Sequence, residues 1–169
     1  MFVRPAKMMY EMRNYGLFYV AGLCTLAQIT TAVFIAAPAN HASTAVLALL
    51  FGLFALLFIY WPMIVLYKHG GVPRTSGYLQ TTNVVDRGPY TIIRHPQYLG
   101  YILINLTFML SNPYWPGMLL GMAAIVCYYK FAQQEDRRLQ ASFGCAYRDY
   151  MLRVPGFNVL GGLLRLLRE

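Results

Sequence analysis

A basic pair, Arg94 and His95, stands directly before Pro96 at the start of a long uncharged segment. Proline is favoured in the first turn of a helix, so the pattern predicts a helix that begins at Pro96. The unpaired amides of that turn and the helix dipole favour an anion nearby, to which Arg94 or His95 could donate a hydrogen bond. Further along, Tyr98 offers an aromatic face that attracts cations, and Gly100 allows a ligand or a helix to approach closely. These residue types could bind a ligand that carries both an anionic and a cationic group.

A second candidate is the acidic pair Glu135 and Asp136, two of only six acidic residues in the chain. Carboxylates here could bind the hydroxyl or ammonium groups of a cofactor. One of them could instead orient a nucleophile or accept its proton.

Each of these groups also has a simpler interpretation. The basic pair could only anchor a helix at the lipid headgroups, and Tyr98 and Gly100 could serve ordinary helix packing. The acidic pair could be solvated beside Arg137 and Arg138, where ion pairs contribute little.

The elements that must position these residues are membrane helices. No Asp, Glu, Lys or Arg occurs from Asn14 to Tyr67 or from His95 to Tyr129. A buried helix of a soluble core needs only about 10 to 14 apolar residues. We therefore expect an all-α fold, an integral membrane helical bundle of about four transmembrane helices followed by cytoplasmic C-terminal helices. The expected spans cover residues 15–36, 44–67, 98–112 and 114–130.

The distribution of basic residues predicts the topology. The 14 Lys and Arg residues lie before residue 14, between residues 68 and 94, and from residue 130 onward, whereas connections 38–43 and 111–117 contain none. This positive-inside pattern predicts a multi-pass protein with both termini cytoplasmic. The net charge of +8 is then explained by topology and anionic membrane lipids, and not by a nucleic acid partner.

After residue 130 the chain becomes polar and predicts further helices. An apolar stripe with spacings of four, four, three and four residues is typical of a helix. Its members are Leu139, Phe143, Tyr147, Tyr150 and Val154, and Gly144 within it predicts a break into two helices. The leucine-rich end from Val159 to Glu169 predicts a helix at the membrane interface.

We expect one membrane domain over residues 1–169. Within it, residues 1–82 would form the first two spans and a loop, residues 83–155 a hairpin with its flanks, and residues 156–169 an interfacial tail.

Two ordered motifs resemble those of a known family. They are Arg94-His95-Pro96-Gln97-Tyr98-Leu99-Gly100 and Glu135-Asp136-x-x-Leu139-x-x-x-Phe143-Gly144-x-x-Tyr147-x-x-Tyr150-x-x-x-Val154-Pro155. Over residues 83–155 the chain resembles the isoprenylcysteine carboxyl methyltransferases, which are membrane enzymes that use S-adenosylmethionine, and it is also similar to phospholipid methyltransferases. Two positions depart from the family pattern: Asp136 replaces the usual Glu, and Phe131 stands where prenylcysteine methyltransferases have Arg.

The resemblance implies methyl transfer from S-adenosylmethionine to a lipophilic or lipidated acceptor, with S-adenosylhomocysteine as product. The implied cofactor site comprises Tyr90, Arg94, His95, Pro96, Tyr98, Gly100, Glu135 and Asp136, with Glu135 as the catalytic carboxylate. The expected acceptor site comprises Tyr101, Tyr128 and Phe131. The acceptor itself stays open among an isoprenylcysteine carboxylate, a phospholipid amine and another amphiphile.

The uncharged segments also allow two other functions. A membrane reductase of the sterol-reductase type would bind NADPH through a similar hairpin, but such proteins are usually much longer. A small transporter of charged substrates would normally have an ionisable residue within a span, and the expected spans have no Asp or Glu. No His, Cys or carboxylate pair has the spacing of metal ligands, so we expect no metal site.

Overall fold

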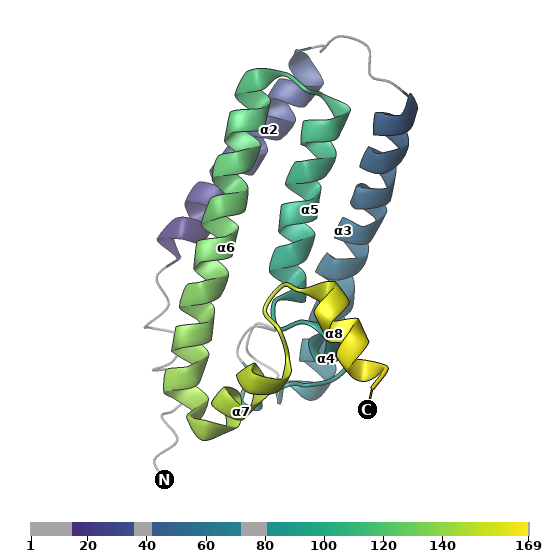
Figure 1. Ribbon diagram of the computed structural model, residues 1–169. Helices are drawn as coiled ribbons and strands as arrows, with labels where there is room; N and C mark the ends of the chain where they lie inside the picture. Colours follow the sequence, from purple (N-terminus) through teal and green to yellow (C-terminus); the bar gives the residue numbers. More distant parts are fainter. Residues whose placement is uncertain (1–14, 36–41, 72–80, 169) are drawn as a thin grey trace. The chain divides into compact units, whose positions relative to one another are not determined.

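The protein is all-helical in a computed structural model that describes residues 15–35, 42–71 and 81–168 (Figure 1). No strand occurs in these ranges, which confirms the expected all-α class. Residues 1–14, residues 36–41 around the first connection and residues 72–80 of the loop lie outside the described residues. The helices are α2 (Gly16–Phe34), α3 (Ala42–His69), α4 (Pro89–Ile92), α5 (Pro96–Ser111), α6 (Trp115–Phe143), α7 (Cys145–Arg153) and α8 (Val159–Leu166).

Two of these helices are long and apolar enough to cross a membrane. They are Gly16–Phe34 and Ser43–His69, with mean hydropathies of 1.7 and 2.4. Only 17% of the most apolar part of each helix is buried, and side chains such as Leu26 and Leu53 are exposed. A helix that exposes apolar side chains all round suits a lipid environment. These helices correspond to the first two predicted spans.

α5 begins at Pro96, as the sequence predicts, and ends at Ser111. α6 starts at Trp115 and continues to Phe143, well beyond the end at Lys130 that was expected for the fourth span. The reason is local, because residues 131–142 contain no glycine or proline and are rich in good helix formers. The acidic pair therefore stands on a regular helix.

α6 ends where the sequence predicts a break. Gly144 has a φ of +60°, in the left-handed region that glycine adopts without strain, and α7 starts at the next residue. The predicted division of the stripe into two helices is confirmed.

The chain forms two compact units. Among the described residues, one unit contains 58–71, 81–97 and 133–168, and we call it the polar unit. The other contains 15–35, 42–57 and 98–132, and we call it the apolar unit. The polar unit includes α4, α7 and α8, whereas the apolar unit includes α2 and most of α5.

Buried polar side chains link α2 to α5 in the apolar unit. Gln28 is 2% exposed, and its Nε2 donates to the carbonyl oxygen of Asn105 at 3.1 Å. Thr25 Oγ1 donates to Asn105 Oδ1 at 3.2 Å. α6 contacts this cluster at Gly121, where an added Cβ would lie 2.5 Å from Gln28 Nε2. Hydrogen bonds between helices and small residues at close contacts stabilise helix packing in membranes.

The core of the polar unit is the predicted stripe. Tyr147, Tyr150 and Val154 are each at most 3% exposed and pack together. Leu139 and Phe143, from the end of α6, pack against them. The helical periodicity seen in the sequence therefore corresponds to one buried cluster.

Candidate active site

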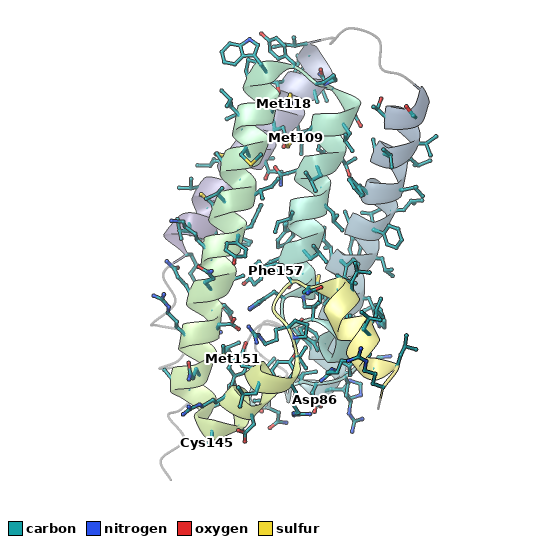
Figure 2. The ribbon with its side chains drawn as sticks, in the orientation of Figure 1. Asp86, Met109, Met118, Cys145, Met151 and Phe157 are labelled. Atoms are coloured by element: carbon teal, nitrogen blue, oxygen red, sulfur yellow. The ribbon has the colours of Figure 1, made fainter. Side chains whose placement is uncertain are left out.

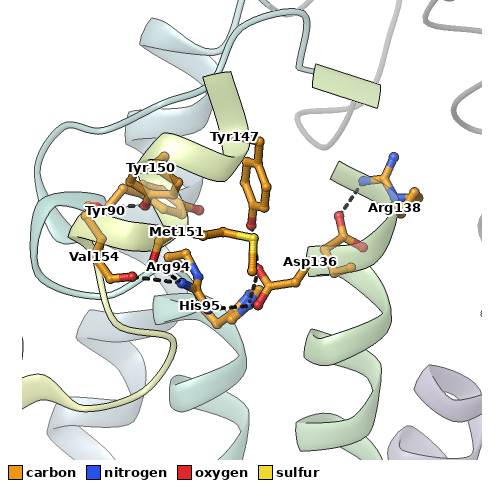
Figure 3. A network of polar contacts seen from close by, with 10 residues as sticks. Tyr90, Arg94, His95, Asp136, Arg138, Tyr147, Tyr150, Met151 and Val154 are labelled. Atoms are coloured by element: carbon orange, nitrogen blue, oxygen red, sulfur yellow. Dashed lines mark hydrogen bonds and ion pairs between the residues drawn. The ribbon is translucent and has the colours of Figure 1, made fainter. Parts of the chain in front are cut away.

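Arg94 lies between α4 and α5 and links α6 to α7 within the polar unit (Figure 3). Its Nη1 donates to the carbonyl oxygens of Met151 and Val154, both at 2.9 Å. Its Nη2 donates to Asp136 Oδ2 at 3.0 Å. The carbonyl groups at the end of a helix have no partner inside it, so the guanidinium caps α7 while it pairs with a carboxylate on α6.

Asp136 also contacts Tyr147 and His95 in this network (Figure 3). Tyr147 donates its hydroxyl to Asp136 Oδ1 at 2.6 Å, and His95 Nε2 lies 2.9 Å from the same oxygen. Burial alone would raise the pKa of this carboxyl group. The contacts with His95, Tyr147 and Arg94 outweigh burial, and the pKa of Asp136 is lower than usual. Asp136 is therefore a buried carboxylate that stays ionised.

The pKa of Tyr147 is shifted in the opposite direction from that of Asp136. Burial, and then the charge of Asp136 and the hydrogen bond to it, raise the pKa of the Tyr147 hydroxyl far above its usual value. Tyr147 therefore stays protonated and acts as a hydrogen-bond donor to the carboxylate.

The segment 154–157, which we call the strap, pairs with the backbone around His95. The Arg94 amide donates to the Pro155 carbonyl oxygen at 2.9 Å, and the His95 amide donates to the Gly156 carbonyl oxygen at 3.2 Å. Phe157, on the connection between α7 and α8 (Figure 2), has its ring centroid 5.5 Å from that of His95. His95 is only 4% exposed. The orientation of the His95 ring is therefore set by its contact with Asp136 and by the strap.

Glu135 has a partner within its own helix. It forms an ion pair with Arg138, one turn further along α6 (Figure 3). The two side chains are 12% and 11% exposed, so the pair is largely withdrawn from water. Loss of either partner would leave the other charge buried and unpaired, which is costly in free energy.

Tyr90 and Pro96 also belong to the polar unit. Tyr90 is 8% exposed and packs with Val65 and Val85, and its carbonyl oxygen accepts a hydrogen bond from the Tyr150 hydroxyl at 2.7 Å. Pro96 is fully buried at the start of α5. The structure therefore places both residues in the framework that surrounds Arg94 and His95.

A cavity of about 60 Å³ lies beside this network in the polar unit, with Arg94, Asn83, Tyr147 and Tyr150 in its lining. One water molecule needs about 10 to 15 Å³, so the cavity has room for a group of carboxylate size. Arg94 Nε is buried and has no hydrogen-bond partner among the described residues. The guanidinium of Arg94, already paired with Asp136, brings a positive charge to the lining of this cavity.

The predicted acceptor residues lie together in the apolar unit. Tyr101 and Tyr128 have ring centroids 5.1 Å apart, and Phe131 lies 5.4 Å from Phe18 and 5.6 Å from Tyr98. These separations are typical of favourable aromatic pairs. Phe131 is 1% exposed and Tyr128 5% exposed, so the cluster is a packed aromatic core. Gly100 is also buried in this unit.

Three residues of these sites had no predicted role: Tyr147, Phe157 and Phe18. Tyr147 was visible in the sequence as part of the apolar stripe, but the stripe did not reveal its bond to Asp136. Nothing in the spacing of Phe157 or Phe18 pointed to His95 or to the aromatic cluster.

Comparisons with known proteins bear on these sites. The family model described as phospholipid methyltransferase matches residues 43–146, more than half of the chain. Methanethiol S-methyltransferase 2 of Bradyrhizobium diazoefficiens is 42% identical over 67 residues. That match covers 39% of this chain and 25% of the relative, so the chain spans about a quarter of that protein. No solved structure matches the chain.

The family match includes both sequence motifs up to residue 146, and with the two apolar helices it supports a membrane location. The chain belongs to the phospholipid methyltransferase family, which confirms the resemblance seen in its motifs.

Proposed function

We propose that the protein is a membrane methyltransferase that transfers a methyl group from S-adenosylmethionine to a lipophilic acceptor. One observation supports this most directly. The two motifs of the resemblance, about 40 residues apart, meet in a buried network of Arg94, His95, Asp136 and Tyr147. The family match and the name of the partial relative agree with a methyltransferase.

The residues present fit one end of this cofactor. The cationic Arg94 lines the cavity and would bind the methionyl carboxylate, and Asp136 keeps the guanidinium and the His95 ring in place for it. The cavity is too small for the adenosine part, which would lie outside it. Glu135 would bind the ammonium or ribose hydroxyl groups.

When bound, S-adenosylmethionine supplies a methyl group that an acceptor lone pair takes up as the carbon–sulfur electron pair returns to sulfur. The protein needs to align the acceptor and to exclude water, because orientation supplies much of the rate enhancement in such a displacement. Where the acceptor is a thiol or an amine, Glu135 would accept its proton.

We propose an amphiphilic acceptor that contacts Tyr101, Tyr128 and Phe131. The side chain at position 131 is apolar and buried, so it offers no charge to neutralise an acceptor carboxylate. This favours an amine or a thiol over a prenylcysteine carboxylate. The name of the partial relative, a methanethiol S-methyltransferase, makes a thiol worth including among the acceptors.

We further propose four membrane spans, with both termini and the 68–94 connection in the cytoplasm. α5 has 16 residues and a length of about 24 Å, so it would be a short span in a hydrocarbon core of about 30 Å.

Cysteine labelling at Ser43 and Ser76 in sealed vesicles tests this topology and should report opposite sides of the membrane. Labelling from the same side would mean that the number of spans is wrong.

The experiment that tests the function is titration of the purified protein with S-adenosylmethionine, S-adenosylhomocysteine and NADPH, followed by methyl-transfer assays. We expect binding of the first two ligands only. Transfer from labelled S-adenosylmethionine should then be measured to phosphatidylethanolamine, to a prenylated cysteine and to a small thiol. Binding of NADPH alone would identify a reductase instead and contradict the proposal.

A further inference from the structure

α8 has a continuous leucine face. Leu160, Leu163, Leu164 and Leu167 follow one another at helical spacing and are 74%, 42%, 55% and 83% exposed. We call these four residues the leucine face. Such spacing places side chains on one side of a helix.

The opposite side of α8 packs on α4 within the polar unit (Figure 1). Gly162 is buried, and an added Cβ would lie 2.0 Å from the carbonyl oxygen of Ile92. Arg165 donates to the carbonyl oxygen of Arg153 at 3.1 Å and to that of Thr91. α8 is therefore a docked element with one packed side and one apolar outer side.

This docking is continuous with the candidate site. The strap enters α8 through Asn158, whose side chain caps the helix by accepting from the Gly161 amide at 2.8 Å. In the same strap, the carbonyl oxygens of Pro155 and Gly156 accept hydrogen bonds from the amides of Arg94 and His95. A displacement of α8 would therefore be passed through the strap to the backbone that positions the His95 ring.

The polar unit also contains the end of a helix that can cross a membrane. The last turns of α3 expose Tyr60, Trp61 and Ile64, and aromatic residues of this kind concentrate at membrane interfaces. Trp61 lies against the start of α4, 3.6 Å from where a Cβ on Gly88 would be. α8 packs on α4, so its leucine face belongs to the same unit as these exposed aromatic residues.

Charge around the leucine face matches an anionic surface. Arg168 directly follows Leu167 of this face and is exposed, and the chain as a whole carries +8. Short helices with an apolar face and flanking arginines bind in the headgroup region of anionic membranes.

We propose that α8 lies on the anionic lipid surface of its own membrane, with the leucine face inserted, and that this docking keeps the strap on His95. The lipid surface would then be part of what orders the site. This inference goes beyond methyl transfer and does not depend on it.

Spin labels can locate the leucine face. In a variant with Cys24, Cys127 and Cys145 replaced, a nitroxide is attached at position 160 or 164, with exposed Asp149 of α7 as the matched control position. The protein is placed in vesicles of phosphatidylcholine and phosphatidylglycerol. We expect labels 160 and 164 to collide more with oxygen than with a water-soluble nickel chelate, and label 149 to do the reverse.

Two outcomes would overturn the surface contact. The first is aqueous accessibility at 160 and 164 equal to that at 149. The second is spin–spin broadening at these positions that disappears on dilution with unlabelled protein, because it would show that a second copy covers the face.

Hydrogen exchange tests the link to His95. The double variant L160S/L164S should raise the exchange rates of the Arg94 and His95 amides about tenfold or more in the same vesicles, because opening of the strap exposes them. L152S removes another exposed leucine (80%) from α7, outside the leucine face, and should leave these rates unchanged. Unchanged rates in the double variant would refute the coupling, whether or not the protein binds S-adenosylhomocysteine.

Discussion

Asp136→Ala is expected to lower the free energy of unfolding by about 3 to 5 kcal/mol, the cost of removing one partner of a buried ion pair. The variant leaves the guanidinium of Arg94, only 12% exposed, without its carboxylate. It also removes the acceptor of the Tyr147 hydroxyl. Unfolding in detergent, followed through the loss of helical signal, measures the effect.

Asp149→Ala is the matched control for this change. Asp149 is also an aspartate of the polar unit, but it lies on α7 and its side chain is exposed. Its replacement should change the free energy of unfolding by no more than about 0.5 kcal/mol. Equal stabilities of the two variants would contradict a buried network centred on Asp136.

The lowered pKa of Asp136 also sets the sign of a pH dependence. A carboxyl group with a lower pKa in the folded state stabilises the fold fully above its unfolded pKa of about 3.9. That contribution is lost as the pH falls through the lower pKa of the folded state. The stability difference between the parent protein and Asp136→Asn should therefore be constant near neutral pH and shrink below about pH 4.

His95→Ala and Glu135→Ala are each expected to weaken binding of S-adenosylhomocysteine by roughly ten- to a hundredfold, since loss of one charge-assisted hydrogen bond costs about 1.5 to 3 kcal/mol. The two changes act on different parts of the network. His95 contacts Asp136 and the strap, whereas Glu135 pairs with Arg138. Calorimetric titration of each purified variant measures the loss.

His69→Ala provides the control, because His69 is exposed at the end of α3 and should not affect binding. Parental melting temperatures would show that the His95 and Glu135 variants fold. Parental affinity in both folded variants would mean that the proposed pocket is misplaced.

The sequence by itself determined where some of the helices begin and end. Pro96 predicts the start of α5 and Gly144 the break between α6 and α7, and both are confirmed. The stripe from Leu139 to Val154 predicts a helical face, and the structure shows its members packed in one cluster. These features follow from the local backbone preferences of proline and glycine and from the helical repeat, which need no knowledge of the rest of the chain.

Only the tertiary structure decided which partners each side chain has. Asp136 pairs with Arg94, which is 42 residues away, and Arg94 bonds to the Val154 carbonyl 60 residues away. The sequence predicted that Arg94, His95 and the acidic pair would share a site, but not that Asp136 bonds to the basic residues and Glu135 to Arg138. Position on a helix determines which side a residue faces, whereas an ion pair depends on which distant segment packs against that side.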